Sequence, residues 1–137
     1  MTTFKINKMI KTTIAHWHNL LESDNAAGLD SLLADNAVFH SPIVHTPQYG
    51  KALTQIYLSA AFMVFYNDTF TYVREVIGER DAVLEFQVEI DGILVNGVDM
   101  IKCDDESKII DFKVMVRPLK AVNLIHQKMM LMLERAK

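Results

Sequence analysis

The sequence contains a single cysteine, Cys103, so it cannot form a disulfide bond within the chain. It also lacks any long apolar run, because the longest, AAFMVF at 60–65, is far too short to span a bilayer. The first residues, MTTFKINKMIK, lack the apolar core of a signal peptide. These absences predict a protein of the reducing cytoplasm that has no membrane segment.

Clusters of basic residues are also missing. The chain has 14 Lys and Arg against 17 Asp and Glu, a formal net charge of -3, and no group of cations that would follow a phosphate backbone. Nucleic acid is therefore not an expected partner. With 137 residues, 50% of them hydrophobic, the chain is long enough for one sizeable core, so we expect a single domain over residues 1–137.

Apolar residues spaced three and four apart predict a first helix with one buried stripe. The stripe contains Ile6, Met9, Ile10, Ile14, Trp17 and Leu21. A short helix is expected at 26–34, where the sequence reads AAGLDSLLA, and another from about 50 to 65. The last helix is expected to begin at Pro118, since proline is favoured in the first turn.

Alternating apolar and polar residues predict five strands. The first is DNAVFHS at 35–41, which ends at Pro42, and four more follow in a row at 69–77, 82–90, 93–103 and 108–116. An Asp-Gly pair at 91–92 is a strong signal for a hairpin turn. The order α-α-β-α-β-β-β-β-α predicts an α+β fold, with an antiparallel sheet that buries one face against the helices.

The alternation also predicts which strand residues face inward. The inward sets are Leu84, Phe86, Val88 and Ile90 in one strand, and Ile110, Phe112, Val114 and Val116 in another. The opposite face still carries Val83, Ile109 and Met115 among its charges. Apolar groups on an outer face usually mark a contact, so we expect a homodimer formed through the outer face of the sheet.

Three stretches, together with the order of elements, resemble one known superfamily. They are LDSLLADNAVFHSP at 29–42, GKALTQIY at 50–57 and GVDMIKCDDESKIIDFKV at 97–114. The chain is similar over nearly its whole length to the nuclear transport factor 2-like superfamily, in its SnoaL-like branch. The resemblance implies a curved sheet wrapped around helices, like a cone, with an apolar pocket at one end. The superfamily includes isomerases, cyclases, dehydratases, epoxide hydrolases and non-catalytic binders, so the fold does not give the function.

Ketosteroid isomerases in this superfamily use a carboxylate base, together with a tyrosine and a protonated aspartic acid that hold an oxyanion. The resemblance places the protonated aspartic acid on Asp99, the tyrosine on Trp17 and the base on Ser41. Only the role of the protonated aspartic acid, at Asp99, is retained in kind. The indole of Trp17 is not an acid, and Ser41 is not a base without help. We therefore expect that this protein does not run the steroid isomerase mechanism.

Asp99 is the first candidate for a functional residue, because aspartate is disfavoured within strands. If it faces the pocket, its neighbours are Phe86, Val88, Phe112 and Val114. Loss of water would then raise the pKa of its carboxyl and hold it near protonation, as a general acid, a hydrogen-bond donor or a shared-proton partner. The alternative is a buried structural aspartate that accepts hydrogen bonds from its neighbours.

His40 and His45 lie in FHSPIVHTPQYGK at 39–51, where either could act as a general base beside Asp99 or simply lie in solvent. Residues five apart point to opposite faces of a regular strand, and no cysteine or His-x-x-x-His pair completes a ligand set. We therefore expect neither a metal site nor a cofactor.

The expected pocket also includes amphipathic rings from the helices, Trp17 and Tyr57, for which plain core packing is the alternative. The predicted ligand-binding set is Trp17, Ser41, Tyr57, Phe86, Val88, Asp99, Phe112 and Val114. Three functions stay open: a binder of a small apolar or polycyclic ligand, a cofactor-free lyase, isomerase or hydrolase that uses Asp99 with a histidine, and a protein-interaction scaffold. An open cavity with Asp99 alone favours the binder, a second polar group near Asp99 favours the enzyme, and a fully packed cone favours the scaffold.

Overall fold

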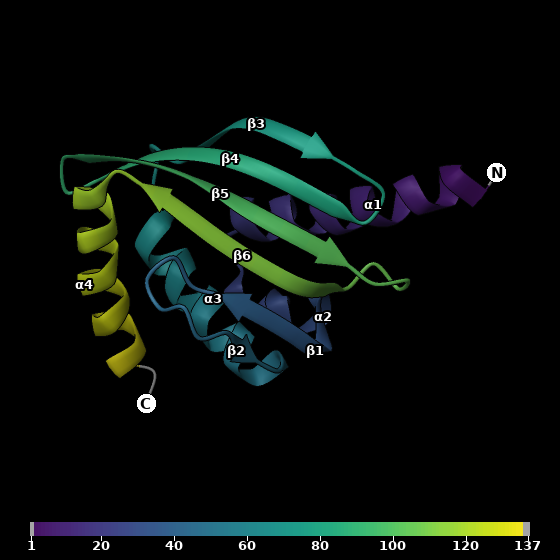
Figure 1. Cartoon of the computed structure of the whole chain (residues 1–137), viewed down its shortest axis with the longest axis horizontal. Helices are drawn as coiled ribbons and strands as arrows, with labels where there is room; N and C mark the ends of the chain where they lie inside the picture. Colours follow the sequence, from purple (N-terminus) through teal and green to yellow (C-terminus); the bar gives the residue numbers. More distant parts are fainter. Residues whose placement is uncertain (1, 136–137) are drawn as a thin grey trace.

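A computed structural model describes residues 2–135 of the chain, with side chains described from residue 9 (Figure 1). The helices are α1 (Thr2–Glu22), the short 3-10 helix η1 (Ala26–Gly28), α2 (Leu29–Leu32), α3 (Lys51–Phe65) and α4 (Leu119–Arg135). The strands are β1 (Leu33–His40), β2 (Gln48–Tyr49), β3 (Thr71–Ile77), β4 (Asp81–Ile90), β5 (Ile93–Cys103) and β6 (Ile109–Arg117). The predicted order of elements is confirmed, and the two-residue strand β2 is an addition to it.

The strands form one curved sheet in the order β2-β1-β6-β5-β4-β3. Four of the neighbouring pairs are antiparallel, as expected, whereas β1 and β6 run parallel and their arrows point the same way in Figure 1. The expectation of a wholly antiparallel sheet is therefore wrong at this pair. Alternation within a strand reveals its two faces but not its direction relative to a strand that is distant in sequence.

The helices α1 and α3 lie against the concave face of the sheet, and α4 lies at one end of the molecule beside α3 (Figure 1). The core forms between these layers. On α1, the predicted stripe is buried at Ile10, Ile14 and Trp17, whereas Ile6 falls outside the side chains that the structure describes. In β4, the four residues predicted to face inward are at most 5% exposed, so the alternation identified the buried face of this strand correctly.

A β-bulge changes the facing of residues at the start of β6. Lys102 pairs with Asp111, but the next residue, Cys103, pairs with Ile109, so Ile110 is an extra residue on β6. The bulge places Ile109 in the core, fully buried, and the prediction that it faces outward is wrong. Of the three apolar residues expected on the outer face, Val83 is half-buried there and Met115 is 49% exposed.

None of the helices within residues 2–135 is both long and apolar enough to cross a membrane.

Candidate functional site

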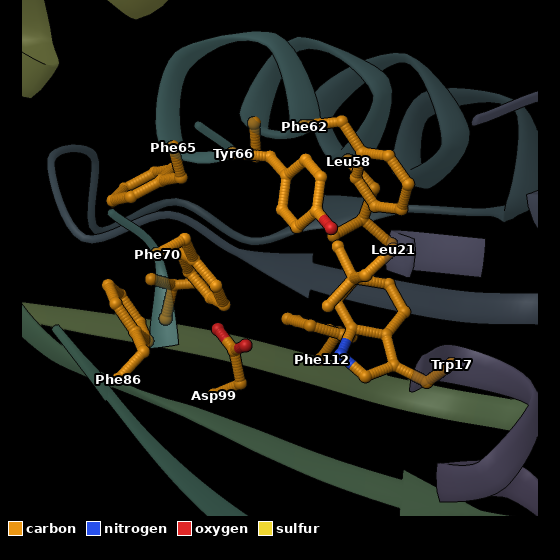
Figure 2. Close-up of a pocket in the computed structure, with 12 residues that line it drawn as sticks. Trp17, Leu21, Leu58, Phe62, Phe65, Tyr66, Phe70, Phe86, Asp99 and Phe112 are labelled. Carbon is orange, nitrogen blue, oxygen red and sulfur yellow. The ribbon is translucent and has the colours of Figure 1, made fainter. Parts of the chain in front are cut away.

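A small apolar cavity lies between α1, α3 and the concave face of the sheet (Figure 2). The space open to the centre of a water molecule is about 40 Å³. That volume holds a few water molecules, and it is well below the roughly 150 Å³ of an apolar cavity known to bind benzene. The described lining residues are Trp17, Leu21, Leu58, Ala61, Phe62, Phe65, Tyr66, Phe70, Phe86, Asp99, Phe112 and Val114.

Asp99 is the one carboxylate among these lining residues. It lies in the middle of β5, between Leu84 of β4 and Val114 of β6. The odd-numbered residues of β5 from Val95 to Cys103 are buried, and Asp99 occupies one of these inward positions with 6% of its surface exposed. The strand therefore places a carboxyl group where its pattern otherwise puts apolar side chains.

Asp99 ends a chain of hydrogen bonds that joins three elements. The Trp17 indole Nε1 on α1 donates to the Tyr72 hydroxyl on β3 at 2.9 Å. That hydroxyl donates in turn to Asp99 Oδ2 at 2.6 Å. A distance this short is typical of a hydroxyl that donates to a charged oxygen or shares a proton with it.

The pKa values of both acids in this chain are raised, chiefly by burial. Loss of water raises the pKa of Asp99 to about 7, against the opposing effect of the hydrogen bond from Tyr72. Burial also raises the pKa of the Tyr72 phenol well above its usual value, and the neighbouring charge of Asp99 adds to this. Tyr72 is therefore a proton-bearing donor at neutral pH, while Asp99 lies close to the midpoint of its titration.

Tyr72 is the main functional candidate that the sequence analysis missed. It lies on β3, an edge strand that is largely exposed, so the segment carries no clear inward face. The available signal was a pair of aromatic residues two apart, Phe70 and Tyr72. Their rings meet edge to face at 5.1 Å, and Phe70 stacks on Phe86 at 5.4 Å.

The cavity brings together five of the predicted ligand-binding residues: Trp17, Phe86, Asp99, Phe112 and Val114. The other three lie outside its described lining. Val88 is buried farther along β4. The Tyr57 ring is stacked on Phe39 at 5.6 Å, which makes it part of the core packing.

Ser41, the third of these, has a local role. Its Oγ accepts a hydrogen bond from the backbone N–H of Ile43 at 3.0 Å, and this closes the turn that ends β1. A hydroxyl used in a turn in this way competes with other roles, since short polar side chains readily bind nearby backbone groups.

The two histidines also lie away from Asp99. Phe39 takes the inward position at the end of β1, so His40 faces the other side of the sheet, where its Nε2 lies 2.8 Å from Asp111 Oδ1. His45 is exposed in the following loop, and both histidines border a separate groove with Lys113. A general base formed by either histidine beside Asp99 therefore finds no support in this arrangement. Within residues 2–135, no cluster of three or more His, Cys, Asp or Glu side chains is suited to hold a metal.

Known structures share this fold. A steroid delta-isomerase from Pseudomonas aeruginosa is 35% identical and superposes with a TM-score of 0.88 over 93% of each chain. An uncharacterised protein with a cystatin-like fold from Silicibacter pomeroyi is 28% identical, with a TM-score of 0.78 over 85% of this chain and 82% of that one. A nuclear transport factor 2-like protein from Mesorhizobium loti is 15% identical, with a TM-score of 0.70 over 82% and 93%, and shares the fold alone. No protein-family model and no curated protein matches the sequence.

Proposed function

The chain belongs to the nuclear transport factor 2-like superfamily, and we propose that it binds a small, neutral, apolar molecule in the cavity under its sheet. The observation that carries this proposal is the hydrogen-bonded chain from Trp17 through Tyr72 to Asp99, which ends at an apolar cavity. Ligand sites commonly combine an apolar lining with a few convergent polar groups that fix orientation.

The polar end of the cavity is suited to a carbonyl group. When Asp99 carries its proton, its own hydroxyl and the hydroxyl of Tyr72 can both donate a hydrogen bond. The hydrogen bond between Tyr72 and Asp99 Oδ2, at 2.6 Å, uses only one of these two protons, so one donor is left over. A carbonyl oxygen can accept the surplus hydrogen bond, whereas a carboxylate ligand would bring a negative charge into a cavity where burial already disfavours the ionised form of Asp99. We therefore infer that the ligand is neutral and carries a ketone or aldehyde group.

Because the described lining of the cavity offers no base separate from Asp99, we rank binding ahead of catalysis. The isomerase mechanism of this superfamily needs one carboxylate to move the proton and other groups to hold the oxyanion. Here the described lining offers one carboxylate, and Ser41, at the position of the base, is engaged in a turn. Tyr72 is the second polar group that would favour an enzyme, but a phenol of raised pKa acts as a donor and not as a base.

A second candidate function is a cofactor-free isomerase in which Asp99 itself takes and returns a proton. Two observations favour it: the pKa of Asp99 is about 7, and the steroid delta-isomerase is 35% identical. A group that titrates near the operating pH can act as both base and acid. Proton exchange next to the carbonyl of a cyclic ketone, followed by NMR in deuterated water, tests this. An isomerase should catalyse the exchange, and Asp99→Asn should abolish it.

Binding is tested with acetophenone and ethylbenzene, which share a ring and differ by the carbonyl group. In Asp99→Leu, we expect the dissociation constant of acetophenone to rise about fivefold relative to that of ethylbenzene, since a buried hydrogen bond contributes about 1 kcal/mol. Asp99→Asn keeps a donor and should keep the ratio. Asp111→Leu, on the outer face beside His40, is the matched control and should also keep it. The dissociation constants can be measured by NMR titration of amide signals.

An unchanged ratio in Asp99→Leu would contradict the binding proposal. If neither compound binds to any variant, the remaining interpretation is the protein-interaction scaffold, in which the packed cavity is only a remnant of a binding site. The scaffold is retained as an alternative because the cavity, at about 40 Å³, is small.

We also propose a homodimer formed through the outer face of the sheet. A groove there is lined by Glu85, Asn96, Val98, Met115 and Arg117, among others. Met115 leaves 49% of its surface exposed within it. Because an apolar side chain surrounded by polar groups is typical of a contact surface, a second copy of the chain is a suitable occupant.

A further inference from the structure

The side chain of Tyr66 occupies the cavity without being tied there by a hydrogen bond. Figure 2 shows its ring in the middle of the lining residues, with the hydroxyl group pointing toward Leu21 and Trp17. The residue is half-buried, and the described residues give its hydroxyl no hydrogen-bond partner. Among the described side chains, its one ring contact is with Phe70, at 5.8 Å between the centroids. The ring therefore fills space in the cavity with few specific bonds to hold it.

The backbone on both sides of Tyr66 is firmly held. Its N–H donates to the carbonyl of Phe62 at 3.1 Å, which closes the last turn of α3. On the other side, the Asn67 side chain donates to the carbonyl of Glu89 at 2.9 Å. The Thr69 hydroxyl accepts from the Glu89 N–H at 2.9 Å. Because the main chain is fixed at both ends, rotation of the side chain about its own bonds is the simplest movement open to Tyr66.

The remaining space is too small for a ring. A volume of about 40 Å³ accommodates a few water molecules, and a benzene-sized ligand needs roughly four times as much. The Tyr66 ring itself has the size and shape that is missing, and it lies among aromatic side chains of the lining such as Phe70, Phe112 and Trp17. Aromatic rings pack well against further flat rings in stacked or edge-to-face arrangements.

We propose that Tyr66 is the gating and size-selecting residue of the site: its ring occupies the place of the ligand's ring, and a planar, ring-bearing carbonyl compound displaces it. This proposal rests on the binding function above, because Tyr72 and Asp99 would hold the carbonyl group. It adds the class of ligand, a flat ring of at least phenol size, and a step of side-chain rotation before binding. Flexible aliphatic ketones would gain less, since they cannot stack on the aromatic lining of the cavity or pack edge to face against it.

The effect of the gate follows from the population of the open rotamer. A ligand that binds only the open form has an apparent dissociation constant raised by the inverse of that population. If the open rotamer is populated at about 10%, removing the ring tightens binding about tenfold. The same factor applies to ketone and hydrocarbon alike, because the gate acts on the ring and not on the carbonyl.

The test compares acetophenone and ethylbenzene binding to the parent protein and to Tyr66→Ala, by NMR titration. We expect Tyr66→Ala to bind both compounds about tenfold more tightly. Tyr66→Phe keeps the ring and should behave like the parent. Tyr66→Leu removes less volume and should change both affinities in the same direction by a smaller factor, and it serves if the alanine variant folds poorly. Tyr49→Ala makes the same chemical change at a residue that is 68% exposed on β2, and it should have no effect.

The outcomes separate this inference from the binding function. Equal or weaker binding of both compounds to Tyr66→Ala and Tyr66→Leu would overturn the gate, even where Asp99→Leu still changes the preference for the ketone. Tighter binding of both compounds, with no effect of Asp99→Leu on their ratio, would support the gate and overturn carbonyl recognition. Weaker binding to Tyr66→Phe would show that the hydroxyl contacts the ligand, and the displacement model would then be wrong.

Discussion

Replacing Asp99 by asparagine tests whether the acid in the cavity is held near its protonated form. The side chain is 6% exposed, and burial raises the pKa of its carboxyl from the ordinary 3.8 to about 7. One pKa unit corresponds to about 1.4 kcal/mol, so the folded state disfavours the ionised carboxylate by about 4 kcal/mol relative to the unfolded chain. This figure is the magnitude that the experiment should recover.

The dependence on pH has a definite direction. Between about pH 4 and pH 7 the folded protein keeps a proton that the unfolded chain releases, so the contribution of Asp99 to the free energy of unfolding falls as the pH rises. Asparagine cannot ionise and lacks this fall. We expect the free energy of unfolding of Asp99→Asn, minus that of the parent, to increase by about 4 kcal/mol between about pH 4 and pH 8. At acid pH the free energies of unfolding of Asp99→Asn and of the parent should be similar, although the asparagine amide has one more N–H donor to bury than the protonated carboxyl.

Urea denaturation at a series of pH values measures this difference, with the fluorescence of the only tryptophan, Trp17, as the signal. Asp35→Asn is the matched control, because it makes the same change at an exposed residue of β1. A difference that stays constant across the pH range would refute the raised pKa. A loss of several kcal/mol in Asp99→Asn at pH 8 would instead identify an ionised structural partner, since breaking a buried pair costs about 3–5 kcal/mol.

Further predictions concern the surroundings of the site and the assembly. Tyr72→Phe removes the hydrogen bond that lowers the pKa of Asp99, so carbon NMR of the carboxyl should show that pKa rising further; a fall would contradict the assigned donor. Gly97→Ala would bring a Cβ within 2.5 Å of the Phe86 ring and 2.6 Å of the Met115 carbonyl oxygen. We expect it to lower the free energy of unfolding by about 1–3 kcal/mol in urea denaturation, and unchanged stability would count against the tight packing. Light scattering should show a dimer that Met115→Lys converts to a monomer, and a monomeric parent at micromolar concentration would rule the dimer out. Metal chelators should leave the thermal midpoint unchanged; a drop that zinc reverses would reveal a metal site that stabilises the native state.

The order of elements could be predicted from the sequence because helices and strands have different hydrophobic periods. The spacing of apolar residues located the long helices, and strict alternation in β4 identified its buried face correctly. The sequence singled out Asp99 as a carboxyl within a strand but left its facing open, because both sets of alternate residues in β5 contain apolar side chains; the structure places it at an inward position. The order of elements and the buried face of β4 depend on residues close together in the chain, so local patterns are enough to predict them.

The partners of Asp99 and the closure of the cavity were decided by the tertiary structure. Tyr72 reaches Asp99 across a separation of 27 residues, from an edge strand whose own pattern shows no buried face. The parallel pairing of β1 with β6 and the bulge that buries Ile109 likewise depend on contacts between distant segments. Such contacts follow from how the layers pack around a shared core, and neither the period nor the composition of a single segment contains that information.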